Sequence, residues 1–73
     1  MEEIIFAIQP EADGGYVAKS KLEKGAIITQ GDDIEELKAM IIDAIEGYFW
    51  DRPDEKPKSV LLKFEEVRKS YYY

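Results

Sequence analysis

Residues 30–50 read QGDDIEELKAMIIDAIEGYFW and form the only long segment of this 73-residue chain with a helical period. Apolar side chains recur there at spacings of three and four, which places them along one face of a helix: Ile34, Leu37, Ile41, Ala44, Ile45 and Tyr48. Asp33 can cap the first turn because its carboxylate accepts from free backbone N–H groups, and Glu36 occupies the second position of a capping box. The pattern predicts a helix over residues 34–50, with an acidic face directed away from the apolar stripe.

The segments on both sides of this helix have the patterns of β-strands. Residues 3–9 alternate between two faces, and residues 16–21, 26–30 and 60–64 are shorter strand-like runs. Asp13, Gly14 and Gly15 favour a turn between the first two, and Pro53 and Pro57 exclude a helix from the loop after residue 50. The order strand, strand, strand, helix, strand predicts an α+β two-layer sandwich, with a mostly antiparallel sheet and the helix packed on one face. We expect a single domain over residues 1–73, with residues 68–73 as a frayed tail.

The composition is acidic. Sixteen Asp and Glu residues against ten Lys and Arg give a formal charge of −6, and residues 31–50 hold six acids and one base. This balance disfavours direct binding of nucleic acid and favours a basic partner protein. The chain has no histidine and no cysteine, which excludes disulfides, imidazole bases, thiol nucleophiles and zinc sites built from these residues. The acidic start and the absence of an apolar run near the roughly 20 residues of a membrane span predict a cytoplasmic protein without a signal peptide.

Four acidic residues raise the alternative of a metal-dependent nuclease. A two-metal hydrolase needs several convergent carboxylates around a phosphate, which Asp13, Asp32, Asp33 and Glu36 could supply. A turn role for Asp13 and capping roles for Asp33 and Glu36 explain these residues without a metal. The glycine pair of the first turn joins two strands and lacks the context of a phosphate-binding loop. We therefore expect no enzyme activity, no cofactor and no metal.

Two motifs together resemble the HicB-like antitoxin domain family. PEADGGYVA, at residues 10–18, resembles the first hairpin of that family. QGDDIEEL, at residues 30–37, followed by DAI at residues 43–45, looks like the start and the middle of the family's helix. The resemblance extends from about residue 4 to residue 66 and implies a partial RNase-H-like fold without the catalytic machinery. It also implies an antitoxin that covers the active site of HicA, a small basic RNA-cleaving toxin.

The chain departs from this family pattern in three places. EKGA, at residues 23–26, stands where the family has a Pro-Gly-Cys connection, and Leu37 replaces a small residue. The residues after the fourth strand are too few for the DNA-binding domain that many members carry. We therefore expect a short stand-alone member without a DNA-binding domain.

The leading hypothesis is a binding module that neutralises a HicA-type toxin by occlusion. The residues expected to contact the toxin lie on the first hairpin and the acidic helix face: Glu11, Asp13, Tyr16, Glu35, Asp43 and Glu46. One alternative is an orphan homo-oligomeric domain, with contacts expected at Ile42, Phe49, Tyr71 and Tyr72. The other is a remnant of an RNase-H-type nuclease. Trp50 either folds back under the helix end or contacts a partner.

Overall fold

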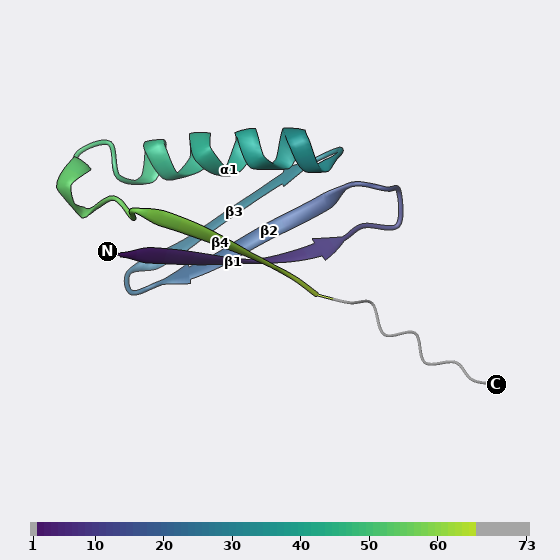
Figure 1. Cartoon of the computed structure of the whole chain (residues 1–73), viewed down its shortest axis with the longest axis horizontal. Helices are drawn as coiled ribbons and strands as arrows, with labels where there is room; N and C mark the ends of the chain where they lie inside the picture. The colour runs from purple at the N-terminus through teal and green to yellow at the C-terminus, as the bar shows by residue number, and fades with distance from the viewer. Residues whose placement is uncertain (1, 66–73) are drawn as a thin grey trace.

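The computed structural model describes residues 2–65, which form four strands and one α-helix in the expected order (Figure 1). The elements are β1 (Glu3–Pro10), β2 (Tyr16–Leu22), β3 (Gly25–Gly31), α1 (Ile34–Tyr48) and β4 (Ser59–Phe64), with a 3-10 turn at Pro53–Glu55 before β4. The predicted α+β class and element order are confirmed. Each strand extends one residue beyond its predicted bounds at one or both ends.

The four strands form one mixed sheet in the order β3-β2-β1-β4. β1 and β3 both pair antiparallel with β2, whereas β4 lies parallel to β1. β3 and β4 lie at opposite edges of the sheet and run in the same direction, so the chain must cross the sheet between them. α1 forms this crossover (Figure 1). The register of β1 and β4 aligns three apolar pairs on one face: Ile4 with Val60, Phe6 with Leu62, and Ile8 with Phe64.

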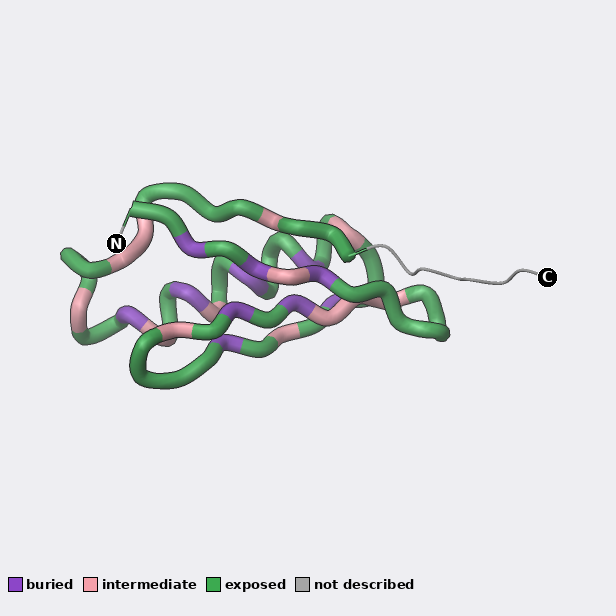
Figure 2. The backbone as a smooth tube through the Cα atoms, turned by 90° about the horizontal axis from the view of Figure 1, so that it is seen from below, coloured by how far each residue is buried: buried purple, intermediate pink, exposed green. Residues whose placement is uncertain are grey.

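The core lies between α1 and the sheet. The predicted helical stripe faces inward, with Leu37, Ile41 and Ile45 buried and the rest of the stripe partly buried. These side chains meet alternate residues of three strands: Ile4, Phe6, Ile8, Ala18 and Ile27. The alternation of buried and exposed positions along the strands is visible in Figure 2. The close backbone contacts of α1 are with β2 and β3, so the helix sits towards one side of the sheet.

The helix ends two residues earlier than the period predicts. Phe49 is its C-cap, and the backbone N–H of Phe49 donates to the carbonyl of Ile45 at 3.0 Å. Phe49 is only 3% exposed, so the expectation that it contacts a second chain is wrong. The chain turns after Tyr48, and this turn directs the Phe49 ring into the core.

The other expected contact residues have different surroundings. Ile42 and Trp50 are 59% and 78% exposed, so Trp50 does not fold back under the helix. Tyr71 and Tyr72, like all of residues 66–73, lie outside the described residues. Within residues 2–65, no helix is long and apolar enough to cross a membrane.

The sheet face opposite α1 is not covered by any element within residues 2–65. Three large apolar side chains on it are exposed, Ile5, Ile28 and Leu61. Three lysines share this face. Lys19 and Lys21 alternate along β2 with the buried Ala18 and Ser20, and Lys63 follows the helix-facing Leu62 on β4. The uncovered sheet face is therefore apolar and basic, in contrast to the acidic outer face of α1.

Candidate functional site

The hairpin between β1 and β2 holds two of the predicted contact residues in a fixed loop. The backbone N–H of Glu11 donates to the carbonyl of Gly15 at 2.7 Å, and that of Gly14 donates to the carbonyl of Glu11 at 3.0 Å. Asp13 Oδ1 accepts from the Gly15 N–H at 3.1 Å, which is the turn role predicted for it. Gly14 has φ of +98°, a conformation that favours glycine. Local hydrogen bonds thus hold this loop, whose Glu11 and Asp13 side chains remain exposed.

The start of α1 lies against this loop and has the predicted Asp33 cap, whereas the Glu36 carboxylate bonds to the backbone one residue before the N-cap position that a capping box requires. Asp33 Oδ1 accepts from the N–H of Glu36 at 2.8 Å, and Glu36 Oε1 accepts from the N–H of Asp32 at 2.6 Å. The two segments approach closely at their glycines, since a Cβ added to Gly15 would lie 3.0 Å from the carbonyl oxygen of Gly31. The capped helix start and the hairpin therefore form one end of the molecule.

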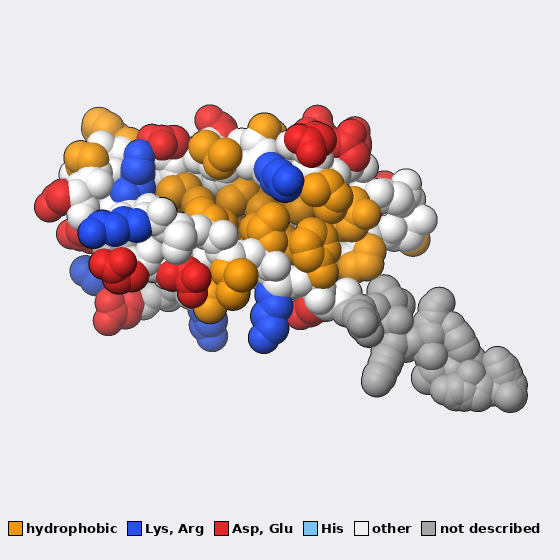
Figure 3. All heavy atoms as spheres, in the orientation of Figure 1, with side chains coloured by type: hydrophobic (Ala, Val, Ile, Leu, Met, Phe, Trp, Pro, Cys, Tyr) orange, Lys and Arg blue, Asp and Glu red, His pale blue; other side chains and the backbone are white. Residues whose placement is uncertain are grey.

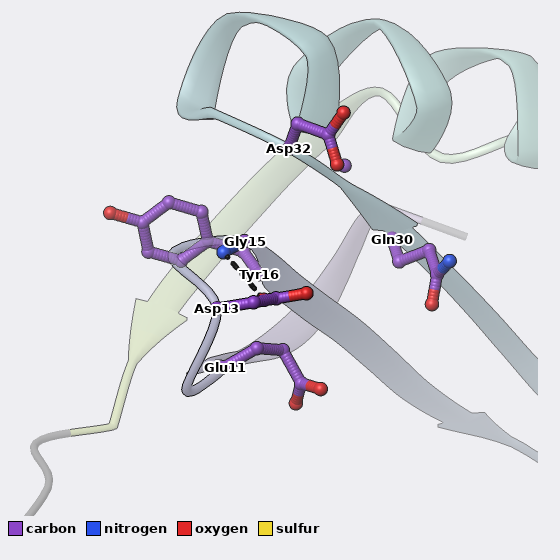
Figure 4. A pocket seen from close by; sticks show the side chains of 7 residues that line it. Glu11, Asp13, Gly15, Tyr16, Gln30 and Asp32 are labelled. Atoms are coloured by element: carbon purple, nitrogen blue, oxygen red, sulfur yellow. Dashed lines mark hydrogen bonds between the residues drawn. The ribbon is translucent and has the colours of Figure 1, made fainter.

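A small recess lies between these two segments (Figure 4). Its lining comes from the hairpin and from the junction of β3 with α1: Glu11, Asp13, Gly15, Tyr16, Gln30, Gly31 and Asp32. Its volume is about 70 Å³, so it holds no more than about two waters or the tip of one long side chain. Three carboxylates line it, which favours a positively charged tip. The structure thus brings the predicted contact residues Glu11, Asp13 and Tyr16 together around one recess and adds Asp32.

Tyr16 has a second role in packing. It is half-buried, and its ring meets that of Phe64 edge-on, with 6.4 Å between the ring centroids and 88° between the planes. The edge-to-face contact joins the hairpin end of β2 to the last residue of β4. Tyr16 therefore supports the recess as well as lining it.

The three predicted residues of the helix face are all exposed, but they are not equivalent. Glu46 Oε2 accepts from Lys56 Nζ at 2.7 Å, so its charge is already paired. Among residues 2–65, no hydrogen bond or ion pair is found for the side chains of Glu35 and Asp43. These two are eight residues apart, or about 12 Å along the helix. The free negative charge of the helix thus lies on its N-terminal and middle turns.

Arg52 organises the opposite end of α1, and sequence reasoning missed it. Its Nη2 donates to the carbonyl of Tyr48 at 2.9 Å, and its guanidinium lies 3.3 Å from Asp51 and 3.5 Å from Glu55. The guanidinium also lies over the rings of Tyr48 and Phe49. The hydrogen bond to Asp51 is the largest cause that raises the pKa of Arg52, so it stays charged at every physiological pH. An arginine two residues after a run of three aromatic residues at the helix end was the available signal.

The carboxylates considered for a nuclease do not form a metal centre. Among the residues that the structure describes, no three Asp, Glu, His or Cys side chains converge well enough to hold a metal ion. A two-metal mechanism needs such convergence around a phosphate. Asp13, Asp33 and Glu36 instead have the turn and capping roles described above.

Comparison with known proteins gives one informative relative. The UPF0150 protein of Thermotoga maritima is 41% identical over 63 residues, which cover 86% of this chain and 83% of the relative. No family model matches the chain, and no solved structure matches it. Identity at this level over most of both chains shows common descent, and this chain belongs to the UPF0150 family.

Proposed function

We propose that this protein is an antitoxin-like binding module that neutralises a small basic RNA-cleaving toxin of the HicA type. The observation that carries the proposal is the recess lined by three carboxylates at the start of α1. The resemblance to HicB-like domains in both the hairpin and the helix supports it. The element order of the fold is also the order expected for such a domain.

The recess gives the module a specific anchor point. The Asp13 carboxylate accepts a hydrogen bond from the backbone N–H of Gly15. The backbone of the other two residues is also held, at Glu11 by the hairpin loop and at Asp32 by its N–H bond to the Glu36 carboxylate. A recess on a backbone held in this way lowers the ordering cost of binding. A lysine or arginine of the toxin would place its charged tip between Glu11, Asp13 and Asp32. Charge-assisted hydrogen bonds of this kind are stronger than neutral ones.

The helix face supplies attraction at longer range. Glu35 and Asp43 project from a chain with a formal charge of −6, so they steer a basic partner towards this side. A toxin that binds RNA must present positive charge to phosphates. An acidic domain that binds this positive surface of the toxin would keep RNA away from it. Such a domain needs no catalytic groups of its own to block the enzyme. We place this encounter in the cytoplasm, where the toxin meets its RNA.

The first experiment identifies the partner. The tagged chain is used to capture proteins from its own host lysate at low and high salt, and the eluted proteins are identified by mass spectrometry. We expect a small basic protein that high salt releases. That protein, once purified, should cleave RNA alone and lose the activity when the chain is added. Capture of no basic protein, or cleavage that the chain does not inhibit, would contradict the proposal.

The second experiment locates the contact. Glu35→Lys together with Asp43→Lys reverses two charges on the helix face. Each reversal adds two positive charges, so the net charge of the chain changes from −6 to −2. Glu3→Lys with Glu23→Lys makes the same change away from that face, at exposed positions. The helix pair should slow association roughly tenfold or more and flatten its salt dependence, whereas the control pair should have a much smaller effect. Equal effects of the two pairs would show that only net charge matters and would remove the helix face from the interface. Glu46 is a poorer choice because reversal would also break its ion pair with Lys56.

A further inference from the structure

The sandwich is open on the β4 side. On β3, the helix-facing Ile27 is covered, at 5% exposure. On β4, Leu62 packs against the core, but Val60 and Phe64 are 41% and 50% exposed. A groove of about 270 Å³ runs between helix and strand, lined by Lys38, Ile41, Ile42, Val60 and Leu62. Figure 3 shows this apolar area as a continuous orange surface below the helix. Nothing within residues 2–65 fills it.

The same strand has an unpaired backbone edge. The N–H of Ser59 donates to the carbonyl of Glu2, and the N–H of Glu65 donates to the carbonyl of Ile8. Backbone groups in a parallel ladder point alternately to the two sides of the strand. The odd-numbered residues therefore bond to β1, and the N–H and C=O groups of the even-numbered ones point outward from the sheet. Those residues are the three with helix-facing apolar side chains: Val60, Leu62 and Phe64.

We infer that β4 pairs antiparallel with β4 of a second copy of this chain, about a two-fold axis through Leu62, and that this pairing covers the groove. The inference is independent of the proposed toxin. It sets Val60 opposite Phe64 of the partner subunit, and Leu62 opposite Leu62 of the partner subunit. All three pairs of this register are hydrogen-bonded pairs, because their backbone groups are the outward ones. The two sheets then join into one of eight strands, with an apolar ladder on the helix side.

This register is the best of those that keep the apolar faces together. On the opposite face it sets Leu61 against Lys63 of the partner subunit and Ser59 against Glu65 of the partner subunit, so no like charges stand directly opposite. An axis through Lys63 would oppose two lysines. An axis through Leu61 would set Phe64 against Lys58 of the partner subunit and lose one apolar pair. Self-complementarity of the backbone groups, the apolar side chains and the charges thus favours a second copy as the occupant.

The area required is modest. A standard interface removes about 800 Å² of surface from each partner, which is about 15% of the 5440 Å² of this chain. The β3 edge is a weaker candidate because α1 already covers its large helix-facing side chain, Ile27.

The inference is tested by exchanging an apolar pair for an ionic one in the full chain. Sedimentation velocity over a range of concentrations should show a dimer for the parent protein. Val60→Glu alone and Phe64→Lys alone should each weaken it about 100-fold or more, because each buries two unpaired charges per dimer. The double variant sets Glu against Lys at both positions and should restore much of the association. Both residues are about half exposed in the single chain, and far-UV circular dichroism checks that each variant is folded.

Single cysteines test the register, since the chain contains none of its own. Leu62→Cys should form an intermolecular disulfide on mild oxidation, because the two Cα atoms would be about 5.5 Å apart. Leu61→Cys is the control, since its Cα atoms would be roughly 8 Å apart, beyond the reach of a disulfide. A parent chain that is monomeric at 100 µM, or a dimer that Val60→Glu leaves intact, would overturn the inference. Cross-linking through Leu61→Cys instead of Leu62→Cys would overturn the register.

Discussion

At the scale of single residues, glycine is required at Gly14 and Gly31 for different reasons. Gly14 has a positive φ in the hairpin. Gly31 has no such conformation, but a Cβ there would lie 2.6 Å from the backbone nitrogen of Leu37 and 2.7 Å from its Cα. The sequence suggests only a turn at Gly31. The structure shows that the first turn of α1 packs directly on this position, and that a side chain would hold the helix away from the sheet.

Gly31→Ala should therefore lower the free energy of unfolding by about 1–3 kcal/mol, because the backbone around Leu37 has to move. Gly47→Ala is the matched control, since Gly47 is an exposed helical position with nothing within 4 Å of an added Cβ. That change should raise the free energy of unfolding by about 0.5–1 kcal/mol. Urea denaturation followed by circular dichroism measures both. Similar changes in the two variants would contradict the close approach.

Phe49 and Trp50 are neighbours in the sequence with opposite surroundings, at 3% and 78% exposure. Phe49→Ala should lower the free energy of unfolding by about 3–5 kcal/mol, as expected for a buried ring. Trp50→Ala should change it by no more than about 0.5 kcal/mol. Denaturation at several protein concentrations gives the comparison. If Phe49→Ala left the stability unchanged and only weakened self-association, the burial of Phe49 would be wrong and the sequence-based expectation right.

At the scale of elements, α1 depends on caps of different kinds at its two ends. The N-terminal cap is a pair of side chain–backbone hydrogen bonds, and the C-terminal one is a guanidinium that donates to the carbonyl of Tyr48. The first was predictable because the Asp33 cap is a local motif. The second depends on the chain turning back after Phe49, so the spacing of residues did not reveal it.

Asp33→Ala should lower the free energy of unfolding by about 1 kcal/mol, through loss of the hydrogen bond that the carboxylate accepts from the N–H of Glu36. Asp33→Asn should retain most of the stability, because asparagine caps helices nearly as well as aspartate. Thermal and urea unfolding of the two variants separate the hydrogen bond from the charge. An asparagine variant as unstable as the alanine variant would show that the charge near the helix dipole matters more.

The elements were predictable from the sequence because their signals lie within a few residues of one another. The stripe of α1, the Asp13 turn and the Asp33 cap all have this local character. The pairing of β4 with β1 and the direction of β4 have no such local signal, because they depend on where the 15-residue helix α1 ends relative to the sheet. The pairing of β4 with β1 places Val60 and Phe64 on the same sheet face as the buried Ile4 and Ile8. Only the structure shows that the helix sits over β2 and β3 and leaves Val60 and Phe64 exposed.

At the scale of the whole molecule, three surfaces differ in chemistry. The outer face of α1 and the hairpin end are acidic, the groove beside β4 is apolar, and the uncovered sheet face combines apolar residues with lysines. The recess and the groove have no lining residue in common, but they adjoin through the contact of Tyr16 with Phe64. Under both proposals, a dimer presents two recesses and binds two toxin molecules. Domains of about this size bury only about 60% of their unfolded surface, so covering the groove would also add stability.

Folding and self-association should therefore be coupled, and the midpoint of thermal unfolding should depend on protein concentration. A tenfold rise in concentration adds about 1.4 kcal/mol per dimer, or about 0.7 kcal/mol per chain. In a domain of this size that shifts the midpoint by about 3–5 °C. Val60→Glu should remove this dependence, because the variant unfolds as a single chain, while Trp50→Ala should retain it. Calorimetry from 10 to 300 µM makes the comparison. If the midpoint of the parent chain stays constant over this range, β4 forms the edge of a stable single chain. A second copy then does not cover its apolar face.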